Sequence, residues 1–184
     1  MGIFSKKSNS ILGLDISSTA IKVVELEKSG NNFRLLHYSI ESLPQNAVSD
    51  NSISDVEQVS SSITRAIKRS GARSRNVATA IPGSHVISKR IYMPQGLRED
   101  ELENQITLEA DHYIPYPLDE VNIDFEVLGP VADSPNEDEI LLVACRKEIV
   151  DDYIAVLEDA GLTPAVLDVD YFAVENAYEQ IVQD

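Results

Sequence analysis

The order of hydrophobic and polar positions in the N-terminal part of the chain predicts three strands, one helix and a fourth strand. Apolar runs or alternation mark strands at residues 11–16, 21–26 and 33–40. The turns between them are short, which favours an antiparallel meander. Helical spacing follows from residue 56 to residue 67, after a capping box formed by Ser54 and Glu57 and before Gly71. A buried strand at residues 77–81 completes a β-β-β-α-β order.

The pattern beyond Pro82 predicts a second series of strands and helices. Strands are expected at residues 86–92, 121–127, 140–144 and 166–169, and helices at residues 98–113, 149–157 and 172–182. The helix that approaches residue 113 must stop before Pro115, because proline disfavours helical backbone in the residue before it. Residues 132–139 are polar and are expected to form a loop.

The charge of the chain argues against nucleic acid as a partner. The sequence has 15 Lys and Arg against 31 Asp and Glu, a net charge of −16, and so acidic a surface repels phosphate backbones. No stretch approaches the roughly 20 apolar residues that span a bilayer, and residues 1–10 lack the apolar core of a signal peptide. We therefore expect a flexible terminus at residues 1–10 and a cytoplasmic protein with no membrane span of its own. Cys145 lies in an apolar run and is expected to be a reduced, buried thiol.

The first predicted hairpin carries candidate chemistry. Its first strand ends at Asp15, its turn is Ser17-Ser18-Thr19, and its returning strand begins with Lys22 in second position. A tight turn of small hydroxylated residues offers backbone and hydroxyl donors to a phosphate, and a lysine can neutralise the phosphate charge. The carboxylate of Asp15 can hold Mg²⁺ through water. The alternative is that any surface hairpin can carry an acid, serines and a lysine.

The hairpin and the strand order resemble the first phosphate loop of the actin-like ATPase superfamily. Within that superfamily four segments resemble the PilM family of type IV pilus assembly proteins. They are GLDISSTAIKVVEL, AIPGS (80–84), LEADHYIPYPLDEVNIDFEVLG (108–129) and LLVACRKEIVDDYIAVLEDAGLTPAVLDVDYFAVENAY (141–178). The resemblance implies an α/β fold, the ribonuclease H-like first lobe of an actin-like ATPase, with a small inserted α+β subdomain of the SHS2 type. The core would be residues 11–82 plus 163–184, and the insertion residues 83–162.

The same resemblance implies ATP and Mg²⁺ as cofactors, bound between two lobes. The phosphate ligands would be Ser17, Ser18, Thr19 and Lys22, and Asp15 would hold Mg²⁺ through water. Asp168 is a further metal candidate, and Asp170 is a catalytic candidate that would position a metal-bound water. The alternative for both is an acid at a strand end that caps the next helix.

Two features bear on how well ATP is held. Many members of the superfamily have glycine where this chain has Ser17, and serine disfavours positive φ. Complete members are about twice as long and carry a second phosphate loop and an adenosine pocket in a second lobe. We therefore expect this chain to be the first lobe alone, to bind ATP weakly and not to hydrolyse it.

A partner is also implied. Proteins of this family bind the cytoplasmic N-terminal peptide of the inner-membrane protein PilN, in a groove between the core and the inserted subdomain. The candidate groove residues are Ile87, Ile91, Tyr92, Met93, Leu102 and Ile106. The alternative is that they form the ordinary core of the subdomain.

The function implied is that of a cytoplasmic adaptor of the inner-membrane pilus assembly platform, associated with the membrane through its partner. Pilus motor ATPases, the platform protein and further copies in a ring are other implied contacts. The alternatives are an FtsA-like cell-division protein, a type II secretion platform protein, and a sugar-kinase-like phosphotransferase. The last alternative lacks a convincing general base in a substrate pocket.

Overall fold

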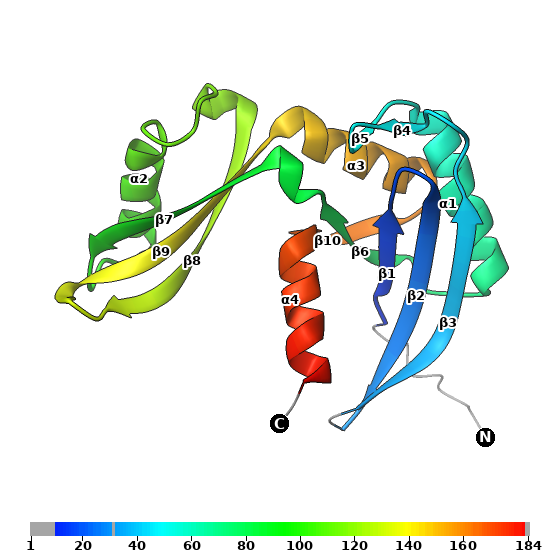
Figure 1. Ribbon diagram of the computed structural model, residues 1–184, viewed down its shortest axis with the longest axis horizontal. Coiled ribbons are helices and arrows are strands. Elements are labelled where there is room, and N and C mark those ends of the chain that lie inside the picture. The colour runs from blue at the N-terminus through cyan, green and yellow to red at the C-terminus, as the bar shows by residue number, and fades with distance from the viewer. Residues whose placement is uncertain (1–9, 31, 183–184) are drawn as a thin grey trace, which may run out of the picture. The chain divides into compact units, whose positions relative to one another are not determined.

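The computed structural model describes residues 10–30 and 32–182, which form two compact units (Figure 1). The first unit contains the described residues up to Pro82 and those from Asp152 onward, and the second unit is Gly83–Asp151. The boundary at Gly83 coincides with the start of the inserted subdomain expected from the sequence. At the other end, residues 152–162 group with the first unit, whereas the sequence placed them in the insertion. The expected flexible terminus, residues 1–10, lies outside the described residues except for Ser10.

A five-stranded sheet forms the centre of the first unit, in the order β10-β6-β1-β2-β3 (Figure 1). The strands are β1 (Leu12–Ile16), β2 (Ala20–Ser29), β3 (Asn32–Ser42), β6 (Asn76–Ile81) and β10 (Thr163–Val169). The first three pair antiparallel in sequence order, which confirms the predicted meander. The strand β6 pairs parallel with both β1 and β10, so the C-terminal ends of these three strands lie at one edge of the sheet.

Helix α1 (Val56–Ser70) covers one face of this sheet and supplies much of its core. Its buried residues include Val59, Ile63 and Ile67, which recur every three or four positions as the sequence predicted. The N-cap is Asp55, whose side chain accepts a hydrogen bond from the backbone N–H of Gln58. The predicted capping box at Ser54 is therefore wrong by one residue.

The reason for this shift lies before the helix. The backbone N–H groups of Ser54 and Asp55 both donate to the carbonyl oxygen of Ala47. This holds Ser54 in the preceding segment and leaves Asp55 as the residue with extended backbone from which the helix starts. At the other end Gly71 adopts a φ of 73° and closes the helix, as expected.

A short hairpin precedes α1. It joins β4 (Val48–Ser49) to β5 (Ser52–Ile53) through Asp50 and Asn51, which have φ values of 50° and 62°. A two-residue hairpin loop with positive φ at both positions is a type I′ turn, and Asp and Asn tolerate this backbone better than most residues. The backbone conformation of the turn therefore explains why Asp and Asn occupy these two positions.

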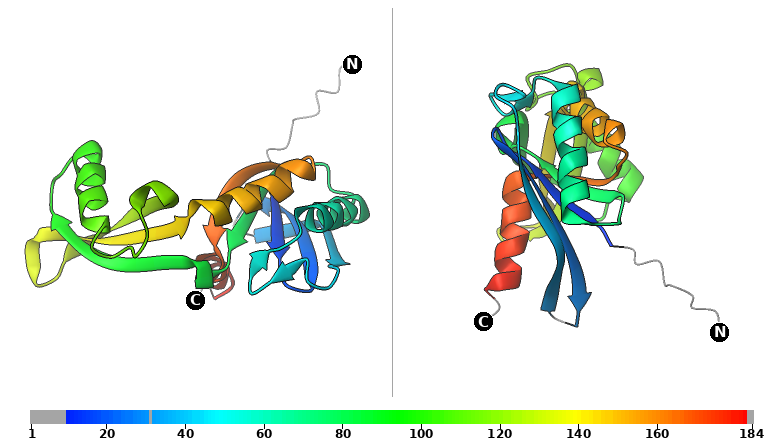
Figure 2. Two further views of the ribbon diagram at one scale, coloured as in Figure 1. Left: turned by 90° about the horizontal axis from the view of Figure 1, so that it is seen from above. Right: turned by 90° about the vertical axis from the view of Figure 1, so that its right-hand side faces the viewer.

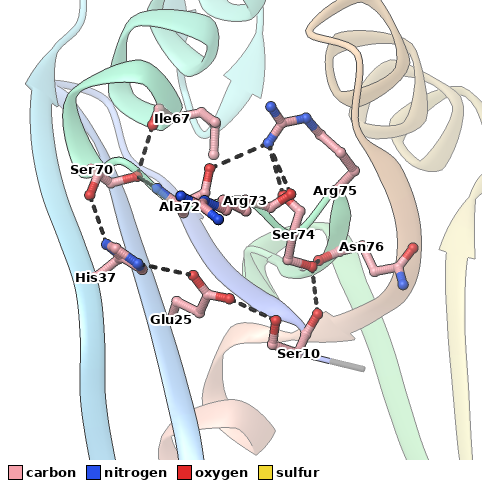
Figure 3. A network of polar contacts seen from close by, with 10 residues as sticks. All are labelled: Ser10, Glu25, His37, Ile67, Ser70, Ala72, Arg73, Ser74, Arg75 and Asn76. Atoms are coloured by element: carbon pink, nitrogen blue, oxygen red, sulfur yellow. Dashed lines mark hydrogen bonds and ion pairs between the residues drawn. The ribbon is translucent and has the colours of Figure 1, made fainter. Parts of the chain in front are cut away.

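A buried carboxylate ties three segments of the first unit together (Figure 3). Glu25 of β2 is 5% exposed, and its Oε1 accepts a hydrogen bond of 2.6 Å from the hydroxyl of Ser10. Its Oε2 lies 3.9 Å from Nε2 of His37 on β3, and Nδ1 of His37 lies 3.0 Å from the carbonyl oxygen of Ser70 at the end of α1. Burial of a charged group is costly unless such partners surround it, so this network fixes β2, β3 and the helix end to one another.

Helix α3 (Lys147–Asp159) begins in the second unit and ends in the first. Near its C-terminus the carboxylate of Asp159 accepts a hydrogen bond of 2.5 Å from the hydroxyl of Ser60 on α1. Helix α4 (Asp170–Ile181) follows β10 and packs against β10 and β6. No described helix is long and apolar enough to cross a membrane.

The second unit is a three-stranded antiparallel sheet with one helix packed on one face, as Figure 2 shows. The strands are β7 (Val86–Pro94), β9 (Ser134–Arg146) and β8 (Val121–Val131) in spatial order, the helix is α2 (Glu99–Ala110), and single 3-10 turns occur at Gly83–His85 and Leu118–Glu120. The core between sheet and helix contains Ile140, Leu142 and Ala144 of the central strand. These elements form the α+β subdomain expected from the sequence.

The polar segment expected to be a loop is mostly strand. The turn between β8 and β9 is only residues 132–133, and residues 134–139 extend β9. Within this segment Asp138 and Glu139 pair with β7 on one side and β8 on the other, Glu137 pairs with β7 and Ser134 pairs with β8. Backbone pairing of this kind allows the polar side chains to stay largely exposed. Composition alone therefore gave the wrong assignment.

Candidate functional site: the turn between the first two strands

Asp15 and Lys22 lie side by side at the turn between β1 and β2. They are direct cross-strand partners in the antiparallel register, so their side chains leave the same face of the sheet. The ammonium nitrogen of Lys22 is 2.7 Å from Oδ2 of Asp15. The two side chains are 54% and 57% exposed, so the pair is accessible to a ligand.

The alternation of buried and exposed residues explains why this pair faces solvent. Leu14, Ile16, Ile21 and Val23 are buried on the face that α1 covers. Because side chains alternate along a strand, Asp15 between the first two and Lys22 between the last two must leave the opposite face. The sequence alternation thus fixes the side of the sheet on which the charged pair lies.

The turn itself is closed by Ser17. Its backbone N–H and its hydroxyl both donate to the carbonyl oxygen of Ala20, at 3.0 and 2.9 Å, and its Oγ also accepts from the N–H of Ala20 at 3.3 Å. The donor of the Ser17 hydroxyl is therefore used inside the turn. Ser18 and Thr19 are exposed at the tip, and the carbonyl oxygen of Thr19 is anchored by the N–H of Leu43 at 2.9 Å.

Serine is compatible with this turn despite the glycine found in many superfamily members. Among the described residues, positive φ outside glycine occurs at Asn46, Asp50 and Asn51, and Ser17 is not one of them. The hydroxyl of Ser17 shapes the turn, and the exposed tip presents the hydroxyls of Ser18 and Thr19 to a phosphate oxygen.

Small residues lie on the same face as Asp15. In register order Gly13 pairs with Ala78, and Ala80 on the same face of β6 pairs with Asp168 of β10. Asp15 and Asp168 thus lie on one face, with two strand spacings, or roughly 10 Å, between their strands. Little side-chain volume therefore lies on the sheet between the two carboxylates, because the residues there are Gly13, Ala78 and Ala80.

Asp168 and Asp170 have different surroundings. Oδ1 of Asp168 accepts a hydrogen bond of 2.7 Å from the backbone N–H of Val169, the residue that precedes α4. Asp170 is the first residue of α4 and is exposed. A carboxylate in the first turn of a helix is favoured by the helix dipole. The N-cap of α4 is Val169, the residue between the two acids.

The donor set suits Mg²⁺ only in company with a phosphate. The described residues contain no group of three or more His, Cys, Asp or Glu side chains that could hold a metal ion. Mg²⁺, however, is commonly held by one or two carboxylates, several waters and the substrate phosphates. Asp15 alone meets that requirement, and it is near the exposed donors of the turn.

Comparison with known proteins decides the family. Residues 13–184 match the sequence model of the family described as type IV pilus assembly protein PilM. The chain belongs to the PilM family. This confirms the resemblance drawn from the sequence, and the α/β class with its β-β-β-α-β core is confirmed with it.

Solved structures agree with this assignment. A structure described as the PilM-PilN type IV pilus biogenesis complex matches with a TM-score of 0.82 and 31% identity over 92% of this chain and 50% of that chain. The cytoplasmic domain of EpsL, an inner-membrane component of the type II secretion system of Vibrio cholerae, matches with a TM-score of 0.56 and 14% identity over 87% of this chain and 57% of that one. The second likeness shows a shared fold alone. The chain spans about half the length of the PilM relative.

The candidate groove residues fall into two groups in this PilM-family chain. Four of them, Ile91, Met93, Leu102 and Ile106, are at most 9% exposed and pack in the core of the second unit. These four residues therefore fit the alternative considered for them, namely that they form the ordinary core of the subdomain. Ile87 is partly buried against the same core, and Tyr92, 57% exposed, points to the opposite face of the sheet.

Sequence reasoning missed the part that Gly13 plays in this site. A Cβ atom built on Gly13 would lie 2.9 Å from Cγ1 of Val24 on β2, closer than real Cβ contacts. The signal was available, because an isolated glycine inside an apolar strand often marks a close approach. Thr79 was also missed; its buried hydroxyl donates to the carbonyl oxygen of Leu14 at 2.7 Å and joins β6 to β1 on the face of the sheet opposite the site.

Proposed function

We propose that the turn between β1 and β2 binds the phosphates of ATP together with Mg²⁺, and that the chain acts as an actin-like adaptor in type IV pilus assembly. One observation carries the nucleotide part: a carboxylate and an ammonium group lie side by side on the face that α1 leaves open, next to the exposed hydroxyls of Ser18 and Thr19. Family membership supports the adaptor part.

The roles follow from chemistry. Ser18 and Thr19 would donate hydrogen bonds to phosphate oxygens, and Lys22 would neutralise their charge. Asp15 would hold Mg²⁺ through water, and the metal, when bound, shields the charge of the phosphates. Asp168, on the same face two strands away, would accept a hydrogen bond from a water of the metal shell. Asp170 keeps the proposed role of orienting a water molecule. We expect weak binding and no hydrolysis by this chain alone.

A nitrogen-15 NMR titration tests the nucleotide part. Millimolar Mg·ATP should shift the amide signals of Ser18 and Thr19, whereas adenosine at the same concentration should not. Asp15→Asn should abolish the gain that Mg²⁺ gives to ATP binding. The matched control is Glu27→Gln, which breaks another exposed cross-strand ion pair, with Arg34, on the same sheet. The proposal would be contradicted if the amide signals of Ser18 and Thr19 did not shift on addition of Mg·ATP.

We further propose that the chain binds the cytoplasmic N-terminal peptide of a PilN-like inner-membrane protein, and that this contact associates it with the membrane. The support is the likeness, at 31% identity, to a chain from a structure described as a PilM-PilN complex. Of the expected contact residues, Tyr92 has the most accessible side chain. Fluorescence anisotropy with a labelled peptide should show binding that Tyr92→Ala weakens. Tyr178→Ala, at a similarly exposed tyrosine of the first unit, is the control.

A further inference from the structure

The ion pair at the turn is placed where both proposed ligands would have to act. The Nζ atom of Lys22 lies 2.7 Å from Oδ2 of Asp15, at the side of the carboxylate where another cation would otherwise approach. A metal-bound water would need the same carboxylate, and a phosphate would need the same ammonium group. Neither ligand can use its group fully while the pair is closed.

Three arginines of α1 and β3 are paired with carboxylates other than Asp15. Arg65 and Arg69 of α1 are both bound to Glu41 at the end of β3, at 2.9 and 3.1 Å. Arg34 pairs with Glu27 farther along the hairpin of β2 and β3. Within residues 10–30 and 32–182, the cation paired with Asp15 is the ammonium group of Lys22.

We propose that Lys22 acts as an internal counter-ion that competes with metal for Asp15 until a phosphate draws the ammonium group away, so that metal and phosphate bind cooperatively. This inference rests on the proposed nucleotide site. When a phosphate accepts the Lys22 ammonium group, the carboxylate of Asp15 becomes available to the metal shell. By reciprocity, metal at Asp15 releases Lys22 to the phosphate.

The exposure of the pair sets the size of the effect. Both side chains are more than half exposed, and exposed ion pairs contribute little because water and salt screen them. Breaking the pair should therefore change affinity by up to about fivefold, the factor that corresponds to the upper value for exposed pairs. The effect should shrink as salt concentration rises. A pair this weak can open readily, as an exchange of partners requires.

Two variants give effects of opposite kind. Asp15→Asn frees Lys22, so it should strengthen the binding of ATP in EDTA by up to about fivefold, although it abolishes the benefit of Mg²⁺. Lys22→Met frees Asp15 and keeps an apolar stem, so it should strengthen the binding of Mn²⁺ alone by a similar factor. Glu27→Gln and Arg34→Met break the matched ion pair away from the turn and should change neither affinity.

The measurement is NMR titration of the 184-residue chain. The amide shifts of Ser18 and Thr19 report ATP in EDTA, and paramagnetic broadening of residues around Asp15 reports Mn²⁺. The proposal is overturned if Lys22→Met binds Mn²⁺ no better than the natural sequence. It is also overturned if the natural sequence binds metal-free ATP and Asp15→Asn binds it no better. If Lys22→Met gains Mn²⁺ affinity while no form binds nucleotide, the counter-ion role of Lys22 toward metal stands and the proposed nucleotide site is refuted.

Discussion

Replacing Gly13 by alanine tests the packing that supports the candidate site. The added Cβ would lie 2.9 Å from Cγ1 of Val24, whereas ordinary contacts are 3.4–4 Å. Overpacking of this kind costs about 1–3 kcal/mol. Alanine also restricts the unfolded chain and favours the strand by about 0.5–1 kcal/mol. We therefore expect Gly13→Ala to lower the free energy of unfolding by about 0.5–2 kcal/mol.

A double-mutant cycle identifies the cause. Val24→Ala removes the Cγ1 atom that the new Cβ would meet, so the double variant should be more stable than the sum of the single effects predicts, by about 1 kcal/mol or more. Urea unfolding followed by circular dichroism measures all four proteins. Gly30→Ala is the control: Gly30 has a φ of 63°, and a Cβ built on it would meet no atom within 4 Å, so the cost of this change should not depend on Val24. Additive effects of Gly13→Ala and Val24→Ala, within about 0.3 kcal/mol, would refute the packing argument.

Three further predictions concern other parts of the molecule. Hydrogen bonds from the backbone and side chain of Gln58 hold the pKa of Asp55 below its usual 3.8. The cap therefore stabilises the fold above pH 3.8, and this stabilisation is lost as the pH falls through the lowered pKa. Asp55→Asn should lose less stability than the natural sequence on acidification to about pH 3 in thermal melts, and an unchanged acid profile would contradict this. Burial raises the pKa of the Cys145 thiol, so Ellman's reagent should label it more slowly in the folded protein than in denaturant, and equal rates would count against burial as the cause. Leu142 is 1% exposed in the second unit, so Leu142→Ala should lower the free energy of unfolding, measured in urea, by about 2–5 kcal/mol. Leu108 is 75% exposed, so Leu108→Ala should lower it little.

The sequence predicted the parts of the fold in which local pattern and tertiary packing agree. The amphipathic spacing in α1 and the alternation in β1 and β2 follow directly from which face of each element is buried. The helix cap failed by one residue because the carbonyl oxygen of Ala47, outside the helix, accepts two backbone hydrogen bonds and sets where the helix can start. The prediction for residues 134–139 failed because backbone pairing with β7 and β8 overrides a polar composition.

The groove residues show a second limit of sequence reasoning. A list of apolar residues on a strand and on the next helix describes an interior core and an exposed groove equally well. Burial separates the two cases here, since Ile91 and Ile106 are nearly inaccessible while Tyr92 is exposed. The alternation of side chains along β7 could have distinguished Ile91 from Tyr92, because neighbouring residues of a strand point to opposite faces of the sheet.

The charged pair at the turn depends on one structural quantity, the length of the hairpin loop. A two-residue loop, Ser18 and Thr19, closed by Ser17 and Ala20, puts Ile16 opposite Ile21 and therefore Asp15 opposite Lys22. A slip of one residue in this register would send Lys22 to the face that α1 covers. The hydrogen bonds of the Ser17 hydroxyl to Ala20 help to fix the loop at this length. Ser17 thus helps to hold the register that pairs the carboxylate of Asp15 with the ammonium group of Lys22.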